Sequence, residues 1–250
     1  MCDKVPFFCI VTIEADKRGS GILDQKGGSD MPQSVFNRYE KKNLIPETVY
    51  QELRGRLSPY MQVDSYGLHT ICNIYYDTTD DLLIRRSIDN PIYKEKLRPR
   101  SYGIPAMDSK VFLEIKKKNQ KVINKCRGQL TLREAYDYVE RGIRPQGDSQ
   151  ILREIDFFLS RYPLERGLYL AYDRVALFGK ENPDFRVTFD QNIRSRRTRM
   201  GLENGDTGET LLPRGGYLME SKVMGLRPCG LPGFCLNSPS RLGRKNRTRH

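Results

Sequence analysis

The sequence predicts an α+β protein: an antiparallel β-barrel of about eight strands, with helices packed against its outer surface. Three observations lead to this prediction. Segments with the two-residue alternation of β-strands outnumber segments with helical periodicity. The strand-like segments follow one another with few helices between them, which favours antiparallel pairing. Several of them carry charged residues on one face and apolar residues on the other, so we expect a curved sheet around a charged interior.

The first predicted elements are a strand over residues 35–45 and a helix over residues 47–57. Pro46 suits the first position of a helix, and Leu53 and Leu57 then recur on one helix face.

The remaining strands are predicted at residues 70–76, 92–102, 111–118, 121–130, 168–178, 185–190 and 217–223. Two helices interrupt them. Thr131 and Glu134 form a capping box, which predicts a helix over residues 132–141, and a second helix is expected over residues 150–161.

The chain divides into three zones. Residues 1–30 are weakly patterned, and we interpret them either as an N-terminal extension or as sequence upstream of a true start at Met31. Residues 31–225 form the expected domain. Residues 226–250 mix Gly, Pro, Ser and Arg without periodicity, which predicts a basic disordered tail.

The charge distribution points to a polyanionic partner. The net charge is +12, but the tail alone contributes six Lys or Arg and no acid. The first thirty residues have one acid more than bases, so residues 31–225 keep a net charge of +7. Nucleic acid, an anionic membrane and a phosphorylated small molecule are all consistent with this excess.

Six cysteines form no CxxC pair or ligand-like cluster, which favours a reduced, cytoplasmic setting. The apolar run at residues 5–13 is short and contains Pro6, so it makes a poor signal peptide.

Charged residues spaced by two recur in the strand-like segments, and such residues share one face of a strand. The sets are Glu40 with Lys42, Lys96 with Arg98 and Arg100, Glu114 with Lys116 and Lys118, Lys125 with Arg127, Arg186 and Asp190 with Thr188 between them, and Glu220 with Lys222. Burying such a charge without water or a partner costs several kcal/mol, so the interior is expected to hold water and a ligand. Because bases outnumber acids, we predict an oligophosphate with a divalent cation.

Six motifs follow one another along the chain: RYEKKNLI (38–45), YKEKLRPRSYG (93–103), FLEIKKK (112–118), YDRVALF (172–178), FRVTFD (185–190) and YLMESK (217–222). In this order they resemble the VTC polyphosphate-polymerase domain, a family of triphosphate tunnel metalloenzymes in the CYTH-like superfamily. The resemblance covers roughly residues 35–225. It implies an antiparallel eight-stranded tunnel, in agreement with the barrel predicted from periodicity.

The resemblance also implies roles for individual residues. The family's phosphate-binding bases correspond to Lys42, Arg98, Arg100, Lys116, Lys125, Arg174 and Arg186. The phosphates of ATP are expected to contact Arg98, Arg100, Lys116, Arg127 and Arg186. Glu220 matches the metal-binding glutamate, Lys222 shares its strand face, and Glu40 and Glu114 are further candidate metal ligands. Tyr102 and Tyr172 are expected to be core aromatics with a hydroxyl group at the rim.

The implied reaction moves the γ-phosphate of ATP onto a growing polyphosphate, with Mn²⁺ or Mg²⁺ as cofactor. The expected partners are ATP, polyphosphate and a membrane protein that receives the chain, with no specific nucleic acid. Membrane association would then arise only through that partner. Two alternatives stay open: a triphosphatase or nucleotidyl cyclase of the same fold, and a non-catalytic protein that binds polyphosphate or nucleic acid.

Three departures from the family pattern bear on activity. Pro99 stands between Arg98 and Arg100 and has no backbone N–H group to donate to a neighbouring strand, which leaves the direction of the Arg100 side chain open. Ser221 replaces an apolar residue. Residues 226–250 lack the amphipathic helix and the lysine motif that follow in the family, and we interpret this as a change of reading frame that impairs activity.

Overall fold

The computed structural model describes residues 38–89, 92–119 and 122–224. The predicted extension at residues 1–30 and the predicted tail at residues 226–250 lie outside the described residues, so both interpretations stay predictions.

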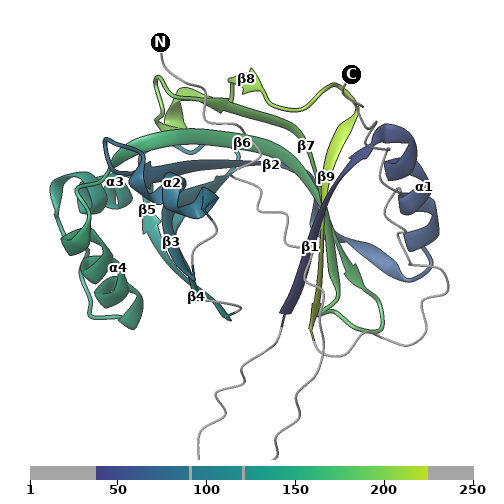
Figure 1. The fold of residues 1–250 in the computed structure, drawn as a ribbon, viewed down its shortest axis with the longest axis horizontal. Coiled ribbons are helices and arrows are strands. Elements are labelled where there is room, and N and C mark those ends of the chain that lie inside the picture. The colour runs from purple at the N-terminus through teal and green to yellow at the C-terminus, as the bar shows by residue number, and fades with distance from the viewer. Residues whose placement is uncertain (1–37, 90–91, 120–121, 225–250) are drawn as a thin grey trace, which may run out of the picture.

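One antiparallel sheet of nine strands dominates the fold (Figure 1). Its strands are β1 (Arg38–Pro46), β2 (Met61–Asp77), β3 (Tyr93–Tyr102), β4 (Lys110–Asn119), β5 (Val122–Thr131), β6 (Glu165–Gly179), β7 (Arg186–Arg196), β8 (Glu209–Thr210) and β9 (Gly216–Met224). The helices are α1 (Glu47–Leu57), α2 (Leu82–Ile88), α3 (Leu132–Arg141) and α4 (Gln150–Arg161), with a 3-10 turn η2 (Leu202–Asn204). The predicted α+β class is confirmed.

The sheet is strongly curved but open. Its strand order is β1-β9-β7-β6-β2-β3-β4-β5, with the short β8 paired to β7. Among the described residues no backbone ladder joins β1 to β5, so the predicted closed barrel is corrected to a curved sheet with two edges. The two sides instead meet through side chains, because Lys116 of β4 lies 3.9 Å from Glu40 of β1. Both sides carry lysines on the facing surface, and like charges disfavour closer pairing.

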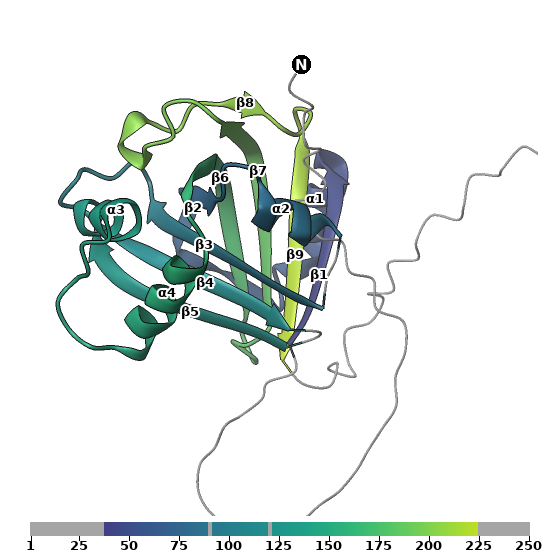
Figure 2. The ribbon, with the colours of Figure 1, turned by 60° about the vertical axis from the view of Figure 1, so that its left-hand side comes forward.

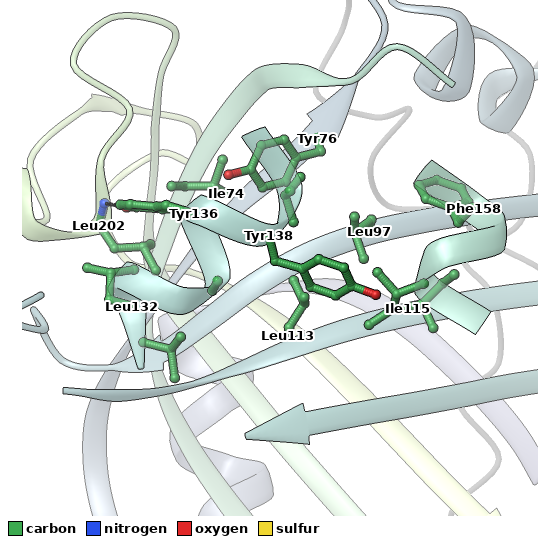
Figure 3. Packing of buried hydrophobic residues seen from close by; sticks show 14 of the residues in the cluster. Ile74, Tyr76, Leu97, Leu113, Ile115, Leu132, Tyr136, Tyr138, Phe158 and Leu202 are labelled. Carbon is green, nitrogen blue, oxygen red and sulfur yellow. Dashed lines mark hydrogen bonds between the residues drawn. The ribbon is translucent and has the colours of Figure 1, made fainter. Parts of the chain in front are cut away.

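Helices α3 and α4 cover the outer face of β3, β4 and β5 (Figure 2). Leu97, Leu113 and Ile115 of the strands are fully buried there against Tyr138 and Phe158 of the helices (Figure 3). These strand residues alternate with the charged ones, so the apolar face packs outward as predicted. Each buried aliphatic side chain contributes roughly 1.5–3 kcal/mol.

Helix α1 lies at the opposite half of the sheet from α3 and α4 (Figure 1). A second apolar cluster packs between α1 and the outer face there. Leu53 and Leu57 of the helix pack against Val187, Phe189 and Met219 of β7 and β9. The two clusters together fix the curvature, because each anchors one half of the outer surface to a helix.

The predicted bounds of α1, α3 and α4 are confirmed, and the capping box of Thr131 and Glu134 is present. Pro46 is the N-cap of α1 and not its first helical residue. Strand β2 begins nine residues earlier than predicted, at Met61, and helix α2 was not predicted. No helix within the described ranges is long and apolar enough to cross a bilayer.

Candidate active site on the inner face of the sheet

The face of the sheet opposite the helices, here called the inner face, gathers the charged residues from seven strands. Directly paired residues of neighbouring strands share a face, and the registers pair Lys42 with Glu220, Arg98 with Glu114 and Lys116 with Lys125. Its bases include Lys42, Lys96, Arg98, Arg100, Lys116, Lys125, Arg127, Arg174, Arg186 and Lys222, and its acids include Glu40, Glu114, Asp190 and Glu220. Every predicted site residue is therefore on one face, with bases in excess.

Glu114 organises the half of the inner face built by β3, β4 and β5. Its Oε2 accepts hydrogen bonds from Nε and Nη2 of Arg98 at 2.9 and 2.8 Å. Its Oε1 lies 2.8 Å from Nζ of Lys125 and 3.7 Å from Nη1 of Arg100. With only 1% of its side chain exposed, Glu114 holds three bases at fixed positions.

The ionisation of this group follows from its surroundings. Burial raises the pKa of Glu114, but Arg98, Arg100 and Lys125 outweigh it and lower the pKa to about 2. Burial also lowers the pKa of Lys125 to about 8, against the opposing effect of Glu114. Glu114 is therefore an anion at neutral pH, whereas Lys125 is still mostly charged there and loses its charge as the pH rises through about 8.

Glu220 is the centre of the other half, built by β1, β6, β7 and β9. Its Oε1 lies 3.5 Å from Nζ of Lys222 and 3.9 Å from Nζ of Lys42. Burial raises the pKa of Glu220, but Lys42, Lys222 and Arg174 lower it to about 2. These ion pairs are longer than hydrogen bonds, so both lysines are available to another anion.

Arg174 belongs to the same half but is held differently. Its Nε and Nη2 donate to the two carboxylate oxygens of Asp190 at 2.6 and 2.7 Å. This bidentate pair fixes the plane of the guanidinium group.

The two halves meet across the inner face. Glu40 of β1 lies 3.9 Å from Nζ of Lys116 and 3.8 Å from Nζ of Lys222. Burial lowers the pKa of Lys116, and Glu40 opposes this effect. The lysines of β1, β4 and β9 consequently converge on one region.

Three inner bases, Lys96, Arg127 and Arg186, have no acidic partner within the described residues. Burial, together with the charges of Lys94 and Lys116, lowers the pKa of Lys96 to about 8. Arg127 lies over the ring of Phe112, 4.8 Å from its centroid. The inner face therefore carries uncompensated positive charge at several points.

Comparison with known families decides what kind of domain this is. Residues 37–231 match the sequence model of the VTC domain. The chain belongs to the VTC domain family. The resemblance inferred from six motifs is confirmed, and the matched range agrees with the predicted one.

Similar solved structures include a candidate adenylate cyclase from Bacillus halodurans (TM-score 0.46, 16% identity), covering 75% of this VTC domain chain and 82% of its own. A candidate adenylyl cyclase from Hippeastrum, described as having a dominant triphosphatase activity, has a TM-score of 0.43 and 14% identity. That match covers 74% of this chain and 78% of the other. A comparison with curated protein sequences found no match.

Sequence reasoning missed two polar residues of the VTC domain's inner face. The hydroxyl group of Tyr75 accepts a hydrogen bond of 2.7 Å from Nη1 of Arg98. The side-chain oxygen of Asn73 accepts one of 3.2 Å from Nε of Arg100. Neither residue is charged, so the spacing of charged residues that predicted the inner face did not include them.

The two tyrosines named from sequence behave differently in this VTC domain. Tyr172 is buried, and its hydroxyl group accepts a hydrogen bond of 3.3 Å from Nη2 of Arg100. Tyr102 was expected in the core, but 47% of it is exposed. It is the last residue of β3, where the sheet no longer covers its ring.

Pro99 does not misdirect Arg100. The ladder between β3 and β4 continues through Pro99, which pairs with Leu113. The ladder between β2 and β3 pairs Leu97 and Arg100 but neither residue between them. The missing donor is thus accommodated by a gap on the β2 side.

The inner face becomes apolar next to the charged residues around Glu220. Its apolar cluster consists of Ile71, Leu170, Tyr172, Ile193 and Leu218, with Leu211 and Leu212 packed against it. Leu218 precedes Glu220 by two residues on β9, so the two side chains are neighbours on one face. The cluster excludes water from one side of the charged group, which strengthens its electrostatic interactions.

Few acids are available for a metal ion. In the part of the chain that the structure describes, no three His, Cys, Asp or Glu side chains gather into a group that could hold a metal. Mg²⁺, however, is usually held by one or two carboxylates together with substrate phosphates. Glu220 provides one carboxylate, and beside it on β7 the buried hydroxyl oxygen of Thr188 has no hydrogen-bond partner among the described residues. Glu220 and Thr188 fit an ion shared with a bound phosphate chain.

Proposed function

We propose that this VTC domain is a metal-dependent polyphosphate polymerase that transfers the γ-phosphate of ATP to the end of a polyphosphate chain. One observation carries the proposal: bases outnumber acids on one surface of the sheet, and Lys96, Arg127 and Arg186 lack an acidic partner among the described residues. Such an excess of positive charge suits an extended polyanion.

Some of the bases would position the phosphate chain, and others would neutralise its charge. Arg98 and Arg174 are held by Glu114 and Asp190, so they present fixed guanidinium groups. Lys42, Lys116 and Lys222 have only long ion pairs of 3.5–3.9 Å, and they can shift toward phosphate oxygens. A terminal oxygen of the polyphosphate attacks the γ-phosphorus, the bond to the β-phosphate oxygen breaks, and ADP leaves. Alignment of donor and acceptor by fixed cations supplies much of the rate enhancement in such transfers.

Glu220 and Thr188 would hold the Mn²⁺ or Mg²⁺ ion. When bound, the ion neutralises part of the charge on the transferred group. Glu114 is less suited to this role, because its two carboxylate oxygens already contact three bases.

The product of incubation with ATP and Mn²⁺ tests the proposal. A polymerase yields ADP and long polyphosphate chains. Release of free phosphate without chains would favour the triphosphatase alternative, and a cyclic nucleotide would favour the cyclase. Absence of turnover together with tight, salt-sensitive polyphosphate binding would favour the non-catalytic alternative.

A substitution of Glu220 separates metal binding from anion binding. Glu220→Gln should abolish turnover but keep polyphosphate binding, because it removes a negative charge from a basic surface. Glu209→Gln, at an exposed position of β8, is the matched control and should leave both unchanged. Wild-type turnover by Glu220→Gln would remove Glu220 from the mechanism.

A further inference from the structure

Four aromatic rings meet at the border of the inner face, where β3 ends. The rings of Tyr66 and Tyr102 are nearly parallel, with centroids 5.9 Å apart. The ring of His69 lies 5.7 Å from Tyr66 and 5.6 Å from Tyr102. Phe112 meets Tyr102 edge to face at 6.1 Å. We call these four residues the aromatic platform.

The platform is exposed to a degree that packing does not explain. Tyr66 is 69% exposed and Tyr102 is 47% exposed. Large aromatic side chains normally bury most of their surface, and a cluster of exposed rings commonly marks a binding site.

The backbone conformation next to these rings favours their exposure. The pairing of β2 with β6 shifts register between Val63 and Leu68, so the bulged segment turns Tyr66 away from the regular ladder. Gly67 within the bulge and Gly103 directly after Tyr102 have φ angles of +59° and +74°. Only glycine adopts this left-handed conformation without strain.

Bases of the proposed phosphate site adjoin the platform. Tyr102 follows Arg100 by two residues on the same strand face, a separation of about 7 Å along the strand. Phe112 is the register partner of Arg100 on β4. The guanidinium group of Arg127 lies over the ring of Phe112, 4.8 Å from its centroid. Aromatic surface and uncompensated positive charge are therefore continuous.

We propose that the aromatic platform binds the nucleobase of the nucleoside triphosphate, while Arg100 and Arg127 contact its phosphates. This inference rests on the proposed function and adds the site that distinguishes a nucleotide from inorganic phosphate. The two parts of the ligand match the two parts of the surface: a flat base stacks on Tyr66 or Tyr102, and the triphosphate extends from there along the basic inner face.

The chemistry of the platform also predicts which nucleotides bind. Stacking on an aromatic ring tolerates every base, because each base has a π-face. We expect ATP and GTP to bind with similar affinity, and CTP and UTP to bind more weakly because their rings offer less stacking area.

Parallel titrations with ATP and inorganic tripolyphosphate test the platform in the full chain. Tyr102→Ala and Tyr66→Ala should each weaken ATP binding about tenfold, as expected for loss of one stacking contact. Neither substitution should change the affinity for tripolyphosphate by more than about twofold, because that ligand has no base. Tyr102→Phe keeps the ring and should bind ATP like the wild type. Tyr60→Ala removes an exposed tyrosine outside the platform and should change neither affinity.

The outcomes separate the platform from the phosphate site. If tripolyphosphate binds normally and Tyr102→Ala leaves ATP affinity unchanged, the platform proposal is overturned while the proposed function stands. Equal weakening of both ligands by Tyr102→Ala would show a general disturbance of the site and would also overturn it. Failure of wild-type protein to bind tripolyphosphate would overturn the proposed function itself. Binding of a single-stranded oligonucleotide that Tyr66→Ala abolishes, with ATP affinity unaffected, would assign the platform to nucleic acid.

Discussion

Replacing Glu114 by Gln should destabilise the domain strongly, because this carboxylate holds Arg98, Arg100 and Lys125 together. The pKa of Glu114 is lowered from its ordinary value of 4.5 to about 2. Each pKa unit corresponds to about 1.4 kcal/mol, so the ionised carboxylate contributes about 3 kcal/mol to the free energy of unfolding. With 1% of the side chain exposed, solvent screens little of this energy. Because the folded-state pKa is depressed, the contribution is present above pH 4.5 and is lost as the pH falls toward 2.

Urea denaturation at neutral pH measures this effect. Glu114→Gln should lower the free energy of unfolding by about 3 kcal/mol, and added tripolyphosphate should restore part of it by occupying the freed bases. Glu52→Gln is the matched control, since it removes the carboxylate of an exposed ion pair with Arg56 on α1 and should cost less than about 1 kcal/mol. A loss in Glu114→Gln no larger than in this control would refute the role of Glu114 as the anchor of the three bases.

Two further predictions concern pH dependence and the outer core. The affinity of the wild type for tripolyphosphate should fall as the pH rises through about 8, because Lys96 and Lys125 both lose their charge there. Lys96→Arg keeps one of these two charges and should therefore lose less affinity over the same range. Isothermal titration at a series of pH values measures these affinities. An identical decline in the affinity of both proteins would exclude Lys96 from the binding surface. Leu113→Ala, at a fully buried position under α3 and α4, should lower the free energy of unfolding by about 2–5 kcal/mol. A cost below about 1 kcal/mol in urea denaturation would contradict the packing of this face.

The sequence was most informative where structure depends on neighbours along the chain. Alternation along strands placed Lys42, Lys116 and Glu220 on one face, because the two-residue repeat of a strand is a local property. The capping box of Thr131 and Glu134 located the start of α3 for the same reason. The six motifs identified the family, which the match of residues 37–231 to the VTC domain confirms.

Features that depend on distant contacts escaped prediction. Helix α2 has no side-chain hydrogen bond from its N-cap. The amide group of Leu82 donates instead to the hydroxyl group of Thr78, and those of Leu83 and Ile84 donate to the carboxylate of Asp77. The open edges of the sheet likewise depend on how β1 and β5 are placed, and alternation within a strand carries no information about that. Tyr75 entered the site only because the fold brings its hydroxyl group to Arg98.

Two adjacent lysines of β1 can show whether the inner face of this sheet binds a phosphate chain. Lys42 lies on the inner face beside Glu220, whereas Lys41 pairs with Ser221 on the opposite face and is exposed. The measurement is the tripolyphosphate affinity of Lys42→Ala and Lys41→Ala by isothermal titration. Both substitutions remove one positive charge from the same strand, so the net charge changes equally. If the inner face binds the phosphate chain, Lys42→Ala should lose about tenfold or more in affinity, as for a lost charge-assisted contact. Lys41→Ala should lose less than about twofold, because its exposed charge is screened. Equal losses in the two variants would contradict binding at the inner face.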